Sequence, residues 1–222
     1  MREAIEIARK ALELLSPSSP SHGLDHAERV YAIAMELASN FENVDRDALA
    51  VAALLHDIAR DLPGDHAANS ADIAFHILVE NGVSKDFAER VREAILCHSY
   101  SRAARYRCES LEGAILSDAD KIDACGAIGI ARTFAYGGEH RRSIEDSLRH
   151  LEIKIARLAE YAHTEVGRKI LCKLSARVRA FISWLREELR SGRETFLTAQ
   201  QIAKDPAHHP MDGSGAKVHK RC

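Results

Sequence analysis

The stretch AALLHDIARD, residues 52–61, places His56 and Asp57 directly after four apolar residues, where a solvated pair of polar side chains is not expected. Successive positions of an α-helix point about 100° apart. An imidazole nitrogen and a carboxylate oxygen on adjacent residues still reach a single ion that lies beside the helix. Because two ligands do not hold a metal ion alone, the pair predicts a site that other parts of the chain complete.

Further histidines and aspartates occupy similar helical settings elsewhere in the sequence. Ligation by a mixture of histidine and carboxylate suits Mn, Fe, Co, Ni or Zn better than it suits a dedicated magnesium cage. A divalent transition metal is therefore expected, with Mg as an alternative. The candidate ligands are His26 in LDHAERV, His66 in GDHAANSA, His98 in AILCHSYS, and Asp118 and Asp120 in ILSDADKID.

The rest of the chain carries the pattern of an all-α protein. Aromatic residues make up only 5% of the sequence, and segment after segment repeats apolar residues at spacings of three and four, the period of an α-helix. The first such stripe consists of Ile5, Ala8, Leu12 and Leu15. Asp45 has the position of an N-cap. We expect further helices over residues 24–40, 45–60, 66–80, 84–97, 111–124, 143–161 and 164–189, a segment that ends at residue 134, and a break at residues 136–138.

The composition is that of an ordinary globular protein. The 222 residues suffice for one large domain or two small ones, and a net charge of −2 gives no general attraction to nucleic acid. Five irregularly spaced cysteines without a CxxC pair indicate neither a disulfide framework nor a zinc ribbon. We find no signal peptide or membrane-spanning stretch and expect a cytoplasmic protein. We further expect one domain over residues 1–204 and a flexible tail over residues 205–222.

Several sequence motifs resemble those of a known family. The segments SHGLDHAERV, AALLHDIARD, AILCHSYS and SDADKIDACGAIGIARTFAYGG carry the likeness, which runs from about residue 21 to residue 136, and HLEIKIARLAEYAHTEVGRKI is a weaker match. The ordered set H…HD…D resembles the HD metal-dependent phosphohydrolase superfamily, and within it a bacterial and archaeal subgroup whose studied relatives include nucleoside triphosphate pyrophosphohydrolases. The resemblance implies an HD-type helical bundle with additional packing helices at the C-terminal end.

The resemblance also implies a ligand set. His26 is the first ligand, His56 and Asp57 are the pair, and Asp120 is the last. Asp118 is the competitor for that last position, and we prefer Asp120 because the family's final aspartate usually lies between Ala and a basic residue, as in Ala119-Asp120-Lys121. In relatives with two metals, extra histidines fall where His66 and His98 lie here, whereas relatives with one metal use this region to bind phosphate. Both alternatives, one ion or two, stay open.

Such a ligand set supports hydrolysis at phosphorus by a water molecule whose pKa the ion lowers. Asp57 is then both a metal ligand and a catalytic residue. The leaving phosphate or pyrophosphate requires cationic help. Lys121 is the preferred phosphate contact and Arg102, which follows His98, is the next. A general base just past the HD pair is expected at Asp61 or Asp65. Further substrate contacts are expected from Arg29 and His22, while Arg60 and Arg132 also lie on or beside the motif helices.

These residues favour an enzyme. We expect hydrolysis of a small phosphorylated substrate, a nucleotide, and favour pyrophosphate release from a nucleoside triphosphate. The first alternative is a nucleoside monophosphate phosphatase or a phosphodiesterase of the same fold, because the fold does not fix the leaving group. The second is a non-catalytic nucleotide or metal sensor, against which the complete ligand set argues. Neither a membrane nor nucleic acid is an expected partner, and the oligomeric state is open, with a homodimer as one alternative.

Overall fold

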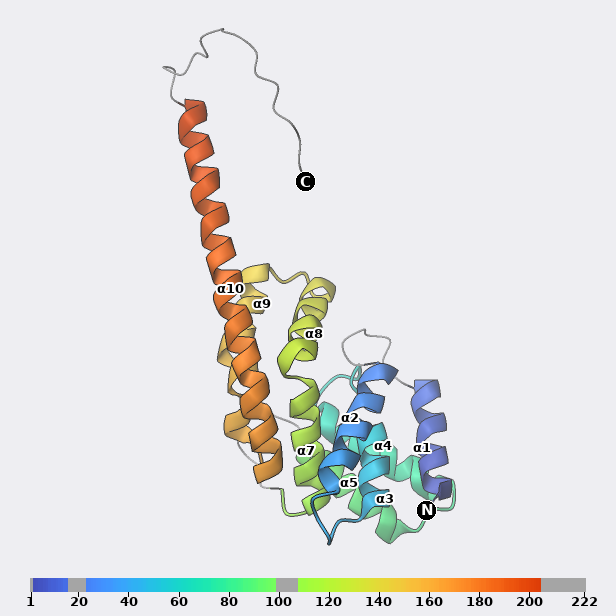
Figure 1. The fold of residues 1–222 in the computed structure, drawn as a ribbon. Coiled ribbons are helices and arrows are strands. Elements are labelled where there is room, and N and C mark those ends of the chain that lie inside the picture. Colours follow the sequence, from blue (N-terminus) through green and yellow to red (C-terminus); the bar gives the residue numbers. More distant parts are fainter. Residues whose placement is uncertain (1, 16–22, 99–107, 205–222) are drawn as a thin grey trace, which may run out of the picture. The chain divides into compact units, whose positions relative to one another are not determined.

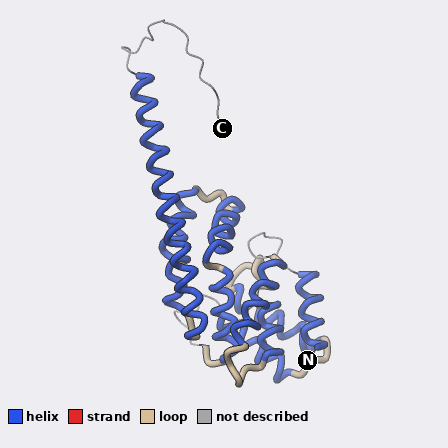
Figure 2. The backbone as a smooth tube through the Cα atoms, in the orientation of Figure 1, coloured by secondary structure: helices blue, strands red, loops and turns tan. Residues whose placement is uncertain are grey.

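The computed structural model describes residues 2–15, 23–98 and 108–204, and these are helices joined by turns and loops, without a strand (Figure 2). The all-α prediction is confirmed. Residues 1–182 form one compact unit and residues 183–222 a second, which contains the C-terminal part of the last helix. The elements are α1 (Arg2–Leu15), α2 (Leu24–Ala38), α3 (Arg46–Leu55), α4 (His66–Glu80), α5 (Lys85–His98), α7 (Leu111–Asp123), α8 (Gly126–Glu139), α9 (Ile144–Ile153), the 3-10 helix η1 (Ile155–Tyr161) and α10 (Glu165–Lys204) (Figure 1).

The centre of the first unit is α3, which is apolar on all sides. Every residue from Ala48 to Leu55 is buried, and α1, α2, α4, α5 and α7 all contact this helix. A helix that is hydrophobic all round belongs in a core. As expected, Asp45 is the N-cap, with its side chain accepting a hydrogen bond from the Ala48 amide at 3.0 Å. The HD pair therefore follows the most buried helix of the fold.

The predicted helix over residues 45–60 is too long, because α3 ends at Leu55. The His56 ring is the physical reason. Its Nδ1 lies 2.8 Å from the Ala53 carbonyl oxygen, which the backbone amide four residues on would otherwise use. The chain continues in tight turns, with the Ile58 amide donating to the Leu55 carbonyl at 3.2 Å. His56 is the C-cap of α3, and Asp57 lies in the turns that follow the helix.

The predicted break at residues 136–138 is also wrong, since α8 continues to Glu139. Gly137 is buried, and a Cβ atom there would lie 2.5 Å from Ser147 Oγ on α9. This glycine provides close helix packing instead of a turn. The turn lies earlier, at Gly126, whose φ of +65° favours glycine and lets α8 begin directly after α7.

The predicted helix over residues 143–161 is divided at Lys154, whose φ and ψ are −121° and −64°. The second part, η1, buries Ile155 and Leu158. A spacing of three places both on one side of a 3-10 helix, which has three residues per turn. The last helix begins at Glu165, close to the predicted start, but extends beyond residue 189 to Lys204.

Other expectations fall close to the observed bounds. Helix α4 covers the predicted residues 66–80, and α2 ends at Ala38 rather than at residue 40. On α1, Ala8 and Leu12 are buried as predicted, whereas Leu15, the last residue of that helix, is exposed. Within the described ranges no helix combines the length and the apolar character that a membrane span requires. The predicted tail over residues 205–222 lies outside the described residues, and the single domain over residues 1–204 stays a prediction.

Candidate metal centre

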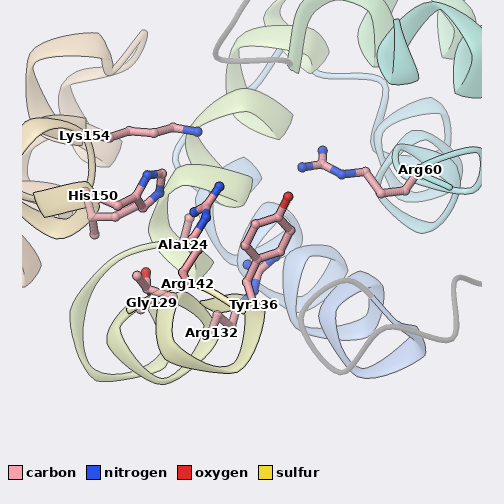
Figure 3. A pocket seen from close by; sticks show the side chains of 10 residues that line it. Arg60, Ala124, Gly129, Arg132, Tyr136, Arg142, His150 and Lys154 are labelled. Carbon is pink, nitrogen blue, oxygen red and sulfur yellow. Dashed lines mark hydrogen bonds between the residues drawn. The ribbon is translucent and has the colours of Figure 1, made fainter. Parts of the chain in front are cut away.

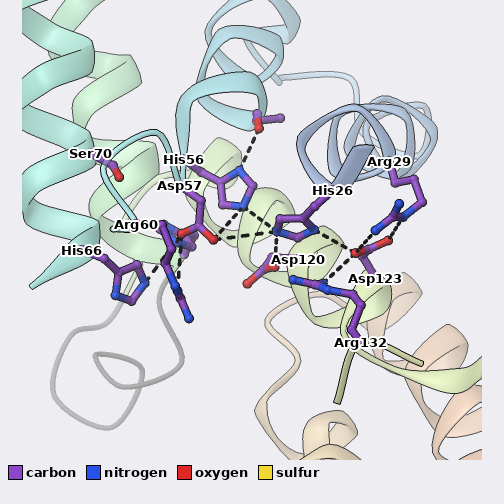
Figure 4. Close-up of polar contacts among 12 residues, drawn as sticks. His26, Arg29, His56, Asp57, Arg60, His66, Ser70, Asp120, Asp123 and Arg132 are labelled. Atoms are coloured by element: carbon purple, nitrogen blue, oxygen red, sulfur yellow. Dashed lines mark hydrogen bonds and ion pairs between the residues drawn. The ribbon is translucent and has the colours of Figure 1, made fainter. Parts of the chain in front are cut away.

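Three predicted ligands, His26, His56 and Asp57, lie within 4.8 Å of one another, and the fourth, Asp120, approaches His26 (Figure 4). His26 comes from α2, His56 and Asp57 follow α3, and Asp120 comes from α7. His26 Nε2 lies 3.2 Å from His56 Nε2, 3.5 Å from Asp120 Oδ1 and 3.9 Å from Asp57 Oδ2. The first three side chains are buried, whereas 27% of the Asp120 side chain is exposed. The cluster is therefore accessible to solvent at Asp120.

The protein's own acceptors orient the two histidines. His56 Nδ1 donates to the Ala53 carbonyl, because a carbonyl oxygen only accepts. His26 Nδ1 donates to Asp123 Oδ2 at 2.8 Å. Both rings consequently present the lone pair of Nε2 to each other across 3.2 Å, an arrangement that is repulsive without a cation. This donor set fits a metal ion, which prefers imidazole nitrogens held in this way by a second hydrogen bond.

The buried carboxylate of Asp57 gives a second reason to expect a cation. Its Oδ1 is inaccessible to solvent and has no hydrogen-bond partner. Such an orphaned acceptor is costly unless a cation compensates it. Around the same oxygen lie Arg60 Nη1 at 3.5 Å, His98 Nε2 at 3.6 Å and His66 Nε2 at 3.8 Å. Asp57 thus belongs to two groups, one with His26 and His56 and one with His66 and His98, so the residues fit one ion or two.

Protonation states in the cluster suit metal binding. Burial lowers the pKa of His56 to about 4, so its ring is neutral at pH 7. Burial alone would raise the pKa of Asp57, but its interactions with the neighbouring His56, His98 and Arg60 lower it well below its ordinary value. The surrounding histidines likewise lower the pKa of Asp120 against the effect of burial. A neutral imidazole and ionised carboxylates are the forms that bind a divalent ion.

The competitor of Asp120 lies elsewhere. Asp118 is buried, and its Oδ1 accepts from the His163 amide at 2.8 Å. Its Oδ2 accepts from the Thr164 amide at 2.8 Å and from the Thr164 hydroxyl at 2.7 Å. Gly167 makes room for it, since a Cβ atom there would lie 2.3 Å from Asp118 Oδ2. Asp118 holds the start of α10 against α7, and Asp120 is the aspartate that the structure brings to the cluster.

Comparison with known proteins agrees with this geometry. The family model of the HD domain matches residues 23–125. A crystal structure of a predicted HD superfamily hydrolase from an uncultured Thermotogales bacterium is 32% identical to this chain, covers 85% of it and 92% of its own chain, and has a TM-score of 0.59. This chain belongs to the HD superfamily.

Two further relatives resemble this HD protein over most of their length. YpgQ from Bacillus subtilis is 29% identical over 176 residues, which are 77% of this chain and 85% of YpgQ. The crystal structure of YpgQ in complex with ADP has a TM-score of 0.68 at 26% identity, covering 84% of this chain and 95% of that one. A Lactobacillus plantarum structure reaches a TM-score of 0.75 at 26% identity, covering 86% and 98%.

The structure places four further predicted site residues of the HD protein, Lys121, Arg29, Asp61 and Asp65, outside the cluster. Lys121 is buried, and its ammonium group donates to the carbonyl oxygen and the hydroxyl of Ser117. Arg29 Nε donates to Asp123 Oδ1 at 2.6 Å. Asp61 is exposed, and Asp65 is the N-cap of α4. His22 and Arg102 lie outside the described residues.

Sequence reasoning missed Asp123, which joins three elements beside the HD cluster. It accepts from His26 Nδ1 on α2, from Arg29 on the same helix, and from Arg132 Nη1 on α8 at 2.7 Å. A signal was present, because Asp123 follows Asp120 by three positions and lies on the same face of a helix. These bonds are made by the carboxylate, so Asp123 orients the His26 ring.

Sequence reasoning also missed a basic pocket of about 270 Å³ next to the HD cluster. Arg60 reaches into it from one side and Lys154 from the other, with the Tyr136 hydroxyl between them (Figure 3). Except for Arg60 and Ala124, the lining residues lie beyond residue 125, where the HD match ends. The pocket residues are Arg60, Ala124, Gly129, Arg132, Thr133, Tyr136, Arg142, His150, Lys154 and Ile155.

Proposed function

We propose that this HD protein is a metal-dependent phosphohydrolase of a small phosphorylated substrate, a nucleotide, and that its favoured reaction releases pyrophosphate from a nucleoside triphosphate. The observation that carries the proposal is the buried group of His26, His56 and Asp57, with Asp120 Oδ1 3.5 Å from His26 Nε2 and both rings oriented by hydrogen bonds to the protein. The crystal structure of YpgQ with ADP supports a nucleotide as the ligand class.

These four residues would hold the ion, and His66 and His98 would serve a second one or contact phosphate. A divalent ion bound there supplies water activation and offsets the negative charge that grows on the phosphoryl oxygens. Asp120, the exposed member, marks the side from which water and substrate enter. Asp123 holds the proton on His26 Nδ1, so that Nε2 keeps its lone pair for the ion.

Among the described residues, Arg60 is the cation best placed to neutralise the transferred phosphoryl group. Its guanidinium lies 3.5 Å from Asp57 Oδ1, and it also lines the basic pocket. Lys121, the preferred phosphate contact in the sequence, donates to Ser117, and Arg29, a further expected substrate contact, donates to Asp123. Arg102, the second choice for the phosphate contact, lies outside the described residues. We therefore assign phosphate contacts to Arg60 and the pocket, and positioning roles to Arg29 and Lys121.

A product assay tests the proposed function. The native protein and Asp57→Ala are incubated with pooled nucleoside mono-, di- and triphosphates, with and without Mn, and the products are identified by mass spectrometry. We expect triphosphate to become monophosphate plus pyrophosphate only with native protein and metal. Asp72→Ala, which removes an exposed carboxylate that pairs with Arg92, is the matched control and should retain full turnover.

Each other outcome has a defined meaning. Conversion of monophosphates to nucleosides and phosphate would replace the favoured reaction by the phosphatase alternative. Retained Mn binding without turnover of any nucleotide would point to a sensor. Asp61→Asn tests the predicted general base. Turnover should be lost if Asp61 is the base and should be unchanged if Asp61 is only an exposed side chain.

A further inference from the structure

The basic pocket is built by residues that follow the HD match. Tyr136 lies on α8, Arg142 lies between α8 and α9, His150 lies on α9, and Lys154 ends that helix. The Arg142 guanidinium stacks over the Tyr136 ring at 4.7 Å from its centroid, which holds this cation at the rim. Among the described residues that line the pocket, none is acidic. The lining chemistry is therefore that of an anion site.

The pocket and the surroundings of the metal cluster share one residue. Arg60 belongs to both, through its approach to Asp57 and its place in the lining. On the opposite wall, burial lowers the pKa of Lys154 while the charge of Asp120 raises it, so this lysine lies within the electrostatic reach of the ligand at the open side. A phosphorus atom beside Asp120 would have the cations of the pocket on one side of it.

This arrangement predicts the orientation of the substrate relative to the pocket and the metal cluster. We propose that the pocket formed by Arg60, Arg142, His150 and Lys154 binds the β- and γ-phosphates of a nucleoside triphosphate, and later the pyrophosphate product, while the nucleoside lies on the other side of the α-phosphorus. The inference rests on the proposed function and deepens it. A cavity of about 270 Å³ is many times larger than one buried water requires, so two phosphoryl groups fit.

The alternatives fit the lining less well. A monophosphatase or a phosphodiesterase places a neutral nucleoside or an ester group on the leaving side, which suits a lining rich in cations less well than a pyrophosphate does. Burial, Lys154 and Arg142 together lower the pKa of His150, and an anion between these groups would relieve that repulsion. In the reaction, the water oxygen bonds to the α-phosphorus and the bond to the bridging oxygen breaks. The electron pair stays on that oxygen, pyrophosphate departs, and the proton of the water passes to solvent.

Calorimetry with a non-hydrolysable probe tests the subsite apart from turnover. The Mn-loaded protein is titrated with imidodiphosphate and, separately, with AMP. We expect Lys154→Gln and Arg142→Gln each to weaken imidodiphosphate binding by about tenfold, the effect of one charge-assisted contact, and to leave AMP affinity unchanged. Arg149→Gln, an exposed arginine on α9 outside this pocket, is the matched control and should bind both probes as native protein does.

The outcomes separate this inference from the proposed function. Native affinity for imidodiphosphate in both variants would overturn the subsite, even if the triphosphate is hydrolysed. Weakened imidodiphosphate binding in the variants, without triphosphate hydrolysis by native protein, would support the subsite and overturn the proposed reaction. Arg142 is exposed, so its variant reports on binding even if Lys154→Gln unfolds.

Discussion

Replacing the carboxylate of Asp123 by an amide should cost both stability and metal affinity. The side chain is fully buried and accepts from His26, Arg29 and Arg132. Burial alone would raise its pKa, but the hydrogen bonds from His26 and Arg29 outweigh that effect. The pKa of Asp123 is therefore lowered to about 2, against 3.8 for an ordinary aspartate. That difference corresponds to about 2 kcal/mol of folding free energy. Because Asp123→Asn also leaves two arginines with a weaker acceptor, we expect a loss of about 2–3 kcal/mol at pH 7.

The pH dependence has a definite sign. A carboxyl group whose pKa is lower in the folded state contributes fully above its unfolded value and loses that contribution as the pH falls toward its folded value. The gap between native protein and Asp123→Asn should therefore be constant above about pH 4 and should narrow between about pH 4 and pH 2. Urea unfolding in chelator at several pH values measures it.

The control for this experiment is an exposed ion pair. Asp72 accepts from Arg92 Nε at 2.9 Å, but its side chain is 56% exposed, so Asp72→Asn should cost at most about 1 kcal/mol. Calorimetry should show Mn affinity reduced about 10- to 100-fold by Asp123→Asn and unchanged by Asp72→Asn. Native stability of Asp123→Asn at pH 7, or a gap that does not narrow in acid, would refute the reasoning.

Three further changes probe the same region. Asp118→Asn should lower the free energy of unfolding in urea by about 2–3 kcal/mol, because it weakens three hydrogen bonds at the start of α10, and should preserve Mn affinity in calorimetry. Asp120→Asn should instead preserve the free energy of unfolding and weaken Mn binding. Equal Mn affinities of the two variants would contradict these separate roles. Gly167→Ala should lower the melting temperature, since the new methyl group would clash with Asp118, whereas Gly138→Ala meets open space and should not; equal melting temperatures would count against the contact. Adding Mn should raise the melting temperature of native protein through binding to the folded state but not that of His56→Ala, and a rise in both would place the ion elsewhere.

The fold class and the family followed from the sequence, but the role of each aspartate required the structure. Asp118 and Asp120 have nearly the same local context, yet residues two apart point about 200° from each other on a helix. Only the position of α10 shows which direction leads to Thr164 and which to His26. The spacing of three residues between Asp120 and Asp123 places both on one face of a helix, but the sequence prediction gave Asp123 no role.

Helix ends and the basic pocket depended on contacts that a local pattern does not contain. The end of α3 at Leu55 depends on the bond from His56 to Ala53, and the continuity of α8 depends on Ser147 opposite Gly137. The pocket combines Arg60 with residues about ninety positions later, such as Lys154. In the sequence those later cations are typical of the solvated face of a packing helix.

The hydrogen bonds that fix the rings of His26 and His56 bear on which metal ion the protein binds in a cell. Both bonds are made to the protein itself, so the fold orients the two nitrogen donors. Sites with these donors follow the Irving–Williams order, so raw affinity alone does not select manganese or iron. The ion found in purified protein then reports the metal supply of the expression host as much as the preference of the chain, and reconstitution with each metal in turn is the measure of that preference.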